Sequence, residues 1–317
     1  MAKSDHAPAA DMPDRRQAGP RRYGIGGQLV AAPTLAPGLY LVATPIGNLR
    51  DVSLRALEIL AAADVIACED TRVTCKLTAH YGIATPLTAY HDHNAATARP
   101  RILARLAAGE SVALVSDAGT PLISDPGYKL VRAAHEAGHP ATAAPGASAT
   151  LAALSLAGLP TDRFLFDGFL PAKSAARQAR IAELARIPAT LVLFETGPRL
   201  AAALTDLAAA LGAREAAICR ELTKLHEEVQ RGDLPALAAG MTGRPEPRGE
   251  IVIVIGPPAP QAPPSADEID GLLRSALARA SVKDAVDEVA AATGEPRREV
   301  YRRALALKAE SGDGAAD

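Results

Sequence analysis

The sequence contains no tryptophan, only three cysteines and no apolar run of membrane-spanning length. Cys68, Cys75 and Cys219 are an odd number without paired metal-site spacing, which argues against a disulfide framework and indicates a reducing compartment. A membrane helix needs about 18 apolar residues in a row, and none is predicted. Because residues 1–37 also lack the apolar core of a signal peptide, we expect a soluble cytoplasmic protein.

A strong charge of either sign is also missing. The chain has 34 Lys and Arg against 36 Asp and Glu, so its formal net charge is −2. Any attraction to nucleic acid must therefore come from local patches. The loop at residues 44–49 is neither a G-x-G-x-x-G sequence nor a Walker A loop, which disfavours a dinucleotide-binding or P-loop enzyme.

What is present is a chain of 317 residues, 48% of them hydrophobic, which suits two medium-sized domains. Residues 1–36 have no periodicity and are predicted to be a disordered tail, and the glycines at 24–27 are discounted as a nucleotide site. We expect an N-terminal α/β domain over 37–145 and a C-terminal α/β domain over 146–258. A Pro-rich linker with a small helical module should occupy 259–317.

The most informative stretch is the loop at residues 116–127. It lies between a buried strand predicted at 111–115 and a helix predicted from Tyr128 onward. Its two glycines allow close approach of a ligand, and its two prolines fix the loop's shape. Because ligands bind past the carboxyl ends of strands in open parallel sheets, we predict a ligand-binding loop. The alternative is an ordinary turn with Ser124 or Asp125 as a helix cap.

Acidic side chains follow the strand predicted at residues 64–68. Glu69 and Asp70 stand there beside Arg72, and carboxylates at a strand end can bind a polar substrate or accept a proton. The alternative is a surface ion pair between Asp70 and Arg72, with a helix cap at Thr71.

A second polar cluster contains His91, His93 and Asn94. Two histidines at positions i and i+2 lack a third ligand of matching type, so no metal site is predicted. Contact with a polar substrate, or a hydrogen-bonded turn, fits the cluster better.

Two further segments each have two interpretations. The turn at 145–149 enters a helix, where backbone N–H groups can hold a carboxylate or where small residues simply pack closely. Residues 173–180 carry three cations and no acid, which can bind phosphate or form a solvated helix face.

The C-terminal module is predicted to contain two helices joined through a turn at Gly294, resembling a helix-turn-helix. The second helix, residues 295–308, is basic near its middle, although the whole module is slightly acidic. A single acidic residue, Glu299, stands among its cations. These are Arg297, Arg298, Arg302, Arg303 and Lys308.

Five motifs, in this order along the chain, resemble one family. They are residues 43–49, 69–72, 91–94, 116–127 and 145–149. Together they closely resemble the methyltransferases of small-subunit ribosomal RNA within the tetrapyrrole methylase superfamily. The resemblance runs from about Gly38 to Gly256 and continues more weakly through the basic tail.

This resemblance implies S-adenosylmethionine-dependent methylation of the ribose 2′-hydroxyl of a cytidine in the decoding region of 16S rRNA. It also implies a fold of two α/β domains with the methyl donor in the interdomain cleft. The 16S rRNA, within the small ribosomal subunit, would be the partner, and the enzyme would be a homodimer.

The donor contacts of the family carry over to five residues: Ile46, Asp117, Thr120, Ser148 and Ala149. The sequence departs from the family pattern at two places. The 145–149 turn has Ala where many members have Pro, and Glu195-Thr196-Gly197-Pro198-Arg199 replaces a Tyr-Glu-Ser-x-x-Arg pattern.

Holding the 2′-oxygen in line with the methyl group supplies much of the rate, and a base that takes the hydroxyl proton would help. Glu69 and Asp70 are the candidate bases, followed by His91, and catalysis by positioning alone stays open. The expected substrate contacts are Arg72, His93, Asn94, Lys173, Arg298 and Arg302.

Two other functions fit parts of the sequence. A methyltransferase of the same superfamily could act on a corrinoid or on a modified protein residue, although the basic tail and the motifs at 69–72 and 91–94 argue against it. A non-enzymatic RNA-binding protein could retain the fold, although the intact donor loops argue against that.

Overall fold

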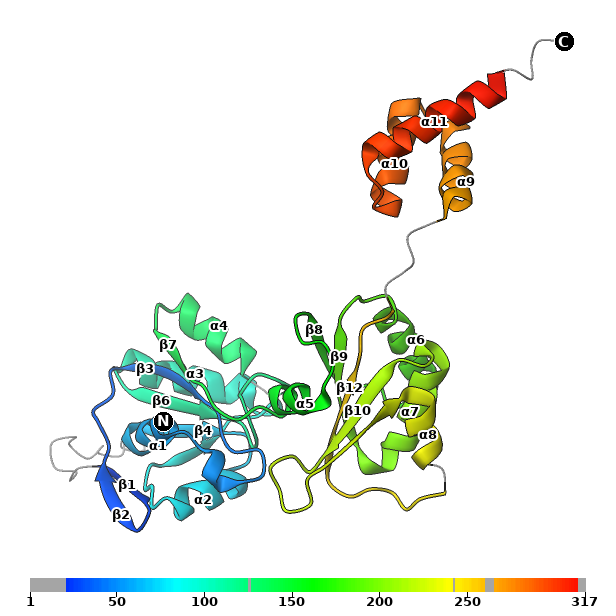
Figure 1. The fold of residues 1–317 in the computed structure, drawn as a ribbon. Coiled ribbons are helices and arrows are strands. Elements are labelled where there is room, and N and C mark those ends of the chain that lie inside the picture. The colour runs from blue at the N-terminus through cyan, green and yellow to red at the C-terminus, as the bar shows by residue number, and fades with distance from the viewer. Residues whose placement is uncertain (1–20, 125–126, 242, 260–264, 313–317) are drawn as a thin grey trace, which may run out of the picture. The chain divides into compact units, whose positions relative to one another are not determined.

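The computed structural model describes residues 21–124, 127–241, 243–259 and 265–312. The chain divides into two compact units, residues 1–257 and 258–317. The described part of the first unit contains a short hairpin and two five-stranded sheets, and that of the second contains three helices (Figure 1).

The first sheet is parallel throughout. In spatial order its strands are β5 (Leu87–Ala89), β4 (Val65–Cys68), β6 (Ser111–Val115), β3 (Gly38–Val42) and β7 (Ala141–Ala144). Strands β4 and β6 are buried along their whole length, as continuous apolar strands covered on both faces should be. Helices α1 (Leu54–Ala62) and α2 (Thr71–His80) cover one face, and α3 (Ala95–Ala107) and α4 (Tyr128–Glu136) cover the other.

This strand order places the ends of β3 and β6 side by side. From β3 the chain crosses β6 to reach β4, whereas from β6 it crosses β3 to reach β7. The two connections leave in opposite directions and open a crevice, which is where open α/β sheets bind their ligands. The loop at 116–127 and the loop after β3 both lie at this point.

The second sheet is mixed. In spatial order its strands are β11 (Glu228–Asp233), β10 (Glu215–Arg220), β12 (Glu250–Ile255), β9 (Thr190–Thr196) and β8 (Phe164–Phe169). Only the β8–β9 pair is parallel. Helices α6 (Ser174–Leu184), α7 (Gly197–Leu211) and α8 (Leu234–Met241) cover one face. The other face packs against α5 (Ala149–Ala157), which follows β7 of the first sheet and so joins the two domains. The predicted pair of α/β domains is confirmed.

The prediction of a disordered tail over residues 1–36 is wrong for its later part. Strands β1 (Arg22–Ile25) and β2 (Gln28–Ala31) form an antiparallel hairpin. Its two-residue turn is Gly26–Gly27, with φ angles of 58° and 80° that glycine adopts without penalty. Tyr23 is 4% exposed and packs into the α1 side of the first core, which anchors the hairpin. The first 20 residues lie outside the described part of the chain.

The helical module is formed by α9 (Ala266–Leu277), α10 (Val282–Thr293) and α11 (Arg297–Gly312), around an apolar core of its own. The last two helices match the prediction, including the left-handed Gly294 that ends α10. Helix α9 was missed, although its capping box, Ser265 with Glu268, is a sequence signature of a helix start. Among the described residues, no helix has the length and apolar character that crossing a membrane requires.

Candidate active site

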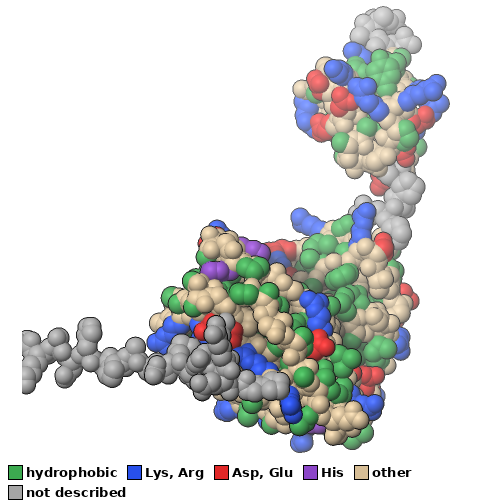
Figure 2. Space-filling model, turned by 90° about the vertical axis from the view of Figure 1, so that its left-hand side faces the viewer, with side chains coloured by type: hydrophobic (Ala, Val, Ile, Leu, Met, Phe, Trp, Pro, Cys, Tyr) green, Lys and Arg blue, Asp and Glu red, His purple; other side chains and the backbone are tan. Residues whose placement is uncertain are grey.

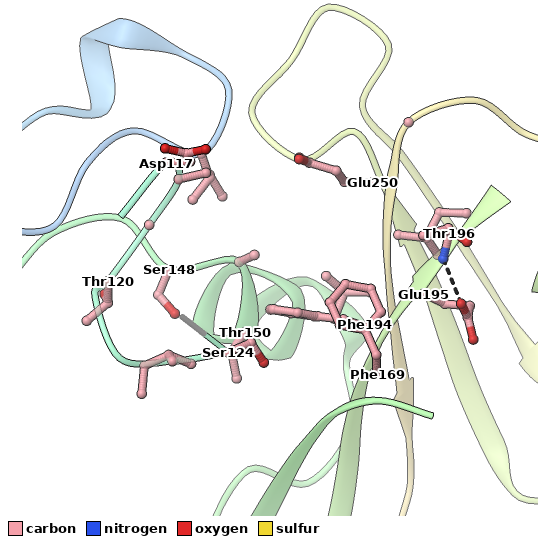
Figure 3. A pocket seen from close by; sticks show the side chains of 18 residues that line it. Asp117, Thr120, Ser124, Ser148, Thr150, Phe169, Phe194, Glu195, Thr196 and Glu250 are labelled. Atoms are coloured by element: carbon pink, nitrogen blue, oxygen red, sulfur yellow. Dashed lines mark hydrogen bonds between the residues drawn. The ribbon is translucent and has the colours of Figure 1, made fainter. Parts of the chain in front are cut away.

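A cavity of about 290 Å³ lies at the crevice of the first sheet and is walled on its far side by the second sheet (Figure 3). All five residues predicted to bind the donor line it, from three different loops: Ile46, Asp117, Thr120, Ser148 and Ala149. These loops follow β3, β6 and β7, whose carboxyl ends share one edge of the parallel sheet. The structure therefore brings together the residues that the resemblance assigned to the donor.

The three loops are hydrogen-bonded to one another. The Thr44 and Gly119 backbones exchange N–H···O bonds of 2.9 and 3.0 Å, and the Thr120 hydroxyl donates to the Ala147 carbonyl at 3.2 Å. Gly119 has a φ of 88°, and a Cβ there would lie 3.2 Å from Ile46 Cγ2. Glycine is thus required both by the backbone and by the narrow space beside the cavity.

The loop after β6 also contains backbone strain. Leu122 and Ser124 have φ angles of 75° and 60°, a region that costs a non-glycine residue about 1–3 kcal/mol and that is concentrated at functional sites. The N-cap of α4 is Gly127, which makes no side-chain cap bond, and Asp125 lies outside the described residues. The loop is therefore more than a capped turn at the start of a helix.

The first turn of α5 lines the cavity with Ser148, Ala149 and Thr150. Ser148 is the N-cap, and its hydroxyl accepts a bond from Leu151 N at 3.4 Å. The N–H groups of Ala149 and Thr150 have no partner inside the helix, and the positive end of the helix dipole lies here. Thr150 lines the cavity, and its hydroxyl is buried with no hydrogen-bond partner. This end of the cavity fits a carboxylate or another polar acceptor.

The wall on the second sheet was missed by the sequence analysis. Phe169 ends β8, and Phe194 lies near the end of β9, with their rings 5.6 Å apart. Strand β12 runs antiparallel to β9, so its first residue, Glu250, pairs with Thr196 and joins the same wall. The two phenylalanines within short apolar runs were a usable sequence signal. The direction of β12 was not, because it depends on long-range pairing.

Glu195 and Arg199 form an ion pair that stabilises this wall. The Glu195 side chain is 1% exposed and lies 3.1 Å from Arg199 Nε, and its Oε1 accepts a bond from Thr196 N at 2.9 Å. Arg199 also donates to the Leu170 carbonyl. The pair therefore joins the ends of β8 and β9, although this stretch departs from the family pattern.

A second cavity, of about 450 Å³, adjoins the first at Asp117. It is lined by the three predicted bases and by two of the predicted substrate contacts, namely Glu69, Asp70, His91, Arg72 and His93. Asp117 lines both cavities, and its Oδ1 accepts a bond from Asp70 N at 3.0 Å. The candidate bases thus lie next to the candidate donor site.

Asp70 is already engaged in this second cavity. It is the N-cap of α2, where the sequence alternative had placed Thr71, and it accepts a bond from Arg72 N at 2.8 Å. It also pairs with the Arg72 guanidinium at 2.5 Å. Hydrogen bonds from the side chain and backbone of Arg72 lower the pKa of Asp70 to about 2, so this carboxylate has little affinity for a proton.

His91 is placed differently. Its Nδ1 atom is buried and has no hydrogen-bond partner, while its backbone N–H donates to Asn94 Oδ1 at 2.9 Å. Asn94 Nδ2 donates to the Ala89 carbonyl at 3.0 Å. The Asn94 side chain therefore holds the turn that presents His91, and it is not among the residues that line either cavity.

Three predicted substrate contacts lie elsewhere. Lys173 is the exposed N-cap residue of α6, and the other two cations of its run are paired, Arg177 with Asp206 and Arg180 with Asp167. Arg298 and Arg302 belong to α11 of the helical module. The module shows basic and acidic side chains interspersed (Figure 2), in pairs such as Arg302–Glu299, Arg297–Asp287 and Arg303–Asp270.

Comparison with known proteins places this geometry in a family. Residues 38–238 match the model of the Tetrapyrrole (Corrin/Porphyrin) Methylases, and residues 263–308 match the RsmI C-terminal HTH domain. A Mesorhizobium japonicum protein named ribosomal RNA small subunit methyltransferase I is 52% identical over 291 residues, covering 92% of this chain and 99% of that protein. The chain belongs to this family of tetrapyrrole methylases.

Two further comparisons agree with this assignment. An Erythrobacter litoralis protein that is also named ribosomal RNA small subunit methyltransferase I is 52% identical and covers 88% of this chain and 98% of its own. A crystal structure of diphthine synthase covers 69% of this chain and 89% of its own with a TM-score of 0.54 at 20% identity, a likeness of fold. The resemblance found in the five motifs is confirmed.

Proposed function

We propose that this protein transfers a methyl group from S-adenosylmethionine to the ribose 2′-hydroxyl of a cytidine in the decoding region of 16S rRNA. The family relatives are named as methyltransferases of small-subunit ribosomal RNA. The observation that carries the proposal is the junction at Asp117, where a cavity lined by all five donor residues adjoins one lined by the candidate bases.

The first cavity fits such a donor. Its polar end offers the unpartnered Thr150 hydroxyl and the free N–H groups of α5, which suit a carboxylate, and Asp117 suits an amine or hydroxyl. Its far wall, with Phe169 and Phe194, suits an apolar or aromatic group. When bound, the donor supplies a methyl group on a cationic sulfur, which is already activated for transfer.

The protein's own contribution is position and proton transfer. No covalent intermediate is needed, and the fixed loops of the cavity hold the reactants in line, which is worth several kcal/mol. We assign proton acceptance from the 2′-hydroxyl to the His91 imidazole, which lines the adjoining cavity. Asp70, with a pKa of about 2, instead holds Arg72 and the start of α2.

The remaining parts of the proposal concern partners. The substrate would be 16S rRNA within the small ribosomal subunit, contacted by Arg72 and His93 near the site and by Arg298 and Arg302 of the helical module. Lys173 and Asn94 stay as further proposed substrate contacts, and Glu69 stays as an alternative proton acceptor. A cytoplasmic homodimer completes the proposal.

The test is a transfer assay with methyl-tritiated donor and three acceptors: small ribosomal subunits, free 16S rRNA and a corrin precursor. Label should enter 16S rRNA. After alkaline hydrolysis, the label should be found at one cytidine whose 3′ linkage is not cleaved, because a methylated 2′-oxygen cannot attack the neighbouring phosphate. Label on the corrin precursor would contradict the proposal. Label on RNA at an alkali-sensitive nucleotide would refute the 2′-oxygen as the target.

A further inference from the structure

A third cavity, of about 380 Å³, lies in the second α/β domain apart from the donor site. Its floor includes Leu200 and Ile218, which belong to the core on the α7 side of the sheet. The donor cavity borders the opposite, α5 side, through residues such as Val252. The rim of the third cavity carries three arginines, Arg220, Arg244 and Arg248, and one carboxylate, Glu228.

The Glu228 carboxylate is hydrogen-bonded by Arg220 and Gln230, and it also interacts electrostatically with Arg244. Glu228 Oε2 accepts bonds from Arg220 at 3.0 and 3.2 Å, and its Oε1 accepts a bond from Gln230 at 2.7 Å. Within the described residues, neither Arg244 nor Arg248 makes a side-chain ion pair. The lining thus holds three arginines and one carboxylate, and this excess of positive charge is the electrostatic requirement of an anion site.

These two arginines are held on a stiff loop. They flank Pro245 and Pro247, whose rings fix the backbone φ angle. Arg220 donates to the Arg248 carbonyl at 3.2 Å. A Cβ added at Gly197 would lie 1.6 Å from the Pro247 carbonyl oxygen, so the loop backbone packs directly against the start of α7. Because the loop backbone is fixed before binding, ordering that backbone around a ligand costs little entropy.

We propose that Arg244 and Arg248 bind a backbone phosphate of the RNA substrate, an inference that rests on the proposed function. A guanidinium matches a phosphate with two parallel hydrogen bonds. The same loop runs directly into Gly249 and Glu250, which line the donor cavity. A phosphate held here would thus belong to the stretch of RNA that approaches the methylation site.

The test uses the full-length chain carrying Arg244→Gln and Arg248→Gln together. A matched control carries Arg101→Gln and Arg186→Gln, two exposed arginines outside this cavity, and changes the net charge equally. Binding to 16S rRNA and to small subunits is measured over a range of salt concentrations. The slope of log affinity against log salt should become shallower by about 0.7 in the cavity variant, the value for one lost single-strand phosphate contact, while donor affinity stays at the wild-type value.

Equal weakening in the control variant would show a nonspecific charge effect and overturn the inference. A cavity variant that binds RNA like wild type would also overturn the inference. If inorganic phosphate raises the melting temperature of the wild type but not of this variant, and RNA binding is unchanged, the cavity binds a free anion and not the RNA. These outcomes are separable from failure of the proposed function, which would appear as a wild-type protein that methylates no RNA.

Discussion

The Asp117 carboxylate has two distinct roles because it lies at the junction of two cavities. One oxygen accepts the Asp70 N–H at 3.0 Å and so ties the loop after β6 to the loop after β4. The carboxylate also lines the donor cavity, where its charge can meet polar groups of the donor. Replacing Asp117 by Ala removes both roles, so that variant alone cannot separate them.

Asp117→Asn separates the two roles, since the amide keeps an oxygen for Asp70 N–H and loses the charge. We expect donor affinity to fall about 10- to 100-fold, because a hydrogen bond to a charged group contributes ~1.5–3 kcal/mol, with the melting temperature nearly unchanged. Asp117→Ala should lose affinity and also melt earlier, because it leaves the Asp70 N–H unpaired. Calorimetric titration and scanning calorimetry measure both quantities, and full donor affinity in the Asn variant would contradict the assignment.

His91 and Asp70 differ in what a neutral replacement should do to the rate. If His91 accepts the proton, His91→Gln should lower the single-turnover rate about 10²–10⁴-fold at unchanged donor affinity. Asp70, whose pKa is lowered to about 2 by its bonds with Arg72, has little affinity for a proton, so Asp70→Asn should leave that rate nearly unchanged. A normal single-turnover rate in His91→Gln would contradict the role of His91.

Asp70→Asn should act on stability rather than on rate. The Arg72 bonds lower the pKa of Asp70 from its ordinary value to about 2, so folding favours the ionised form. Its stabilising contribution is present above the ordinary carboxyl range and is lost as the pH falls toward 2. The difference in melting temperature between wild type and Asp70→Asn should therefore be largest near neutral pH and shrink below about pH 4. A difference that stays constant with pH would count against this ion pair.

At the scale of elements, α5 belongs to both domains, because it starts at the loop after β7 and packs on β10 and β12. Its first turn forms the polar end of the donor cavity. Thr150 is 5% exposed there, and its hydroxyl has no partner. A buried hydroxyl without a partner costs free energy, and a bound ligand that accepts its hydrogen bond would remove that cost.

Thr150→Val tests this idea with a side chain of nearly the same shape. We expect the free protein to melt at the same or a higher temperature, since no hydrogen bond is lost. Donor affinity should fall about 2- to 12-fold, corresponding to ~0.5–1.5 kcal/mol for one hydrogen bond. Thr78→Val is a matched control at another buried threonine, remote from the cavity, whose hydroxyl donates to Cys75 O; it should lower stability and spare donor affinity. Unchanged affinity in Thr150→Val would rule out this contact.

Local sequence signals predicted the elements that are determined locally. The apolar run at 111–115 is β6, and the turn predicted at Gly294 ends α10. Features that depend on long-range contacts could not be seen this way. The hairpin at 22–31 is stabilised by burial of Tyr23 against a helix far along the chain, and the start of β12 reaches the cavity only because that strand is antiparallel.

The site shows the same division. The five donor residues were assigned from loop motifs, because each motif is a contiguous stretch at a strand end, and the cavity unites them. Phe169, Phe194 and Glu250 were missed because the pairing of a second sheet brings them to the wall. The roles of Asp70 and Arg72 could not be separated from sequence either, since only the geometry shows which bonds the carboxylate makes.

For the whole molecule, the division at Pro257 and Pro258 separates two units with different tasks in the proposed function. Both described cavities of the proposed active site belong to the first unit. The second unit has an apolar core of its own, which includes Leu273, Val286 and Val300. Removing the second unit should therefore leave the active-site cavities intact.

Deleting residues 258–317 should leave the donor affinity and the melting of the first unit unchanged. Affinity for 16S rRNA should fall, with a shallower salt dependence, because cations of α11 that neutralise phosphates are removed. A full-length variant with Arg298→Gln and Arg302→Gln tests whether charge alone explains the loss, since it keeps the module's core. If charge is responsible, this variant should show most of the change in slope, by about 1 for each lost phosphate contact. A truncated chain that binds RNA as tightly as the full chain at every salt concentration would show that the module makes no contact with the RNA.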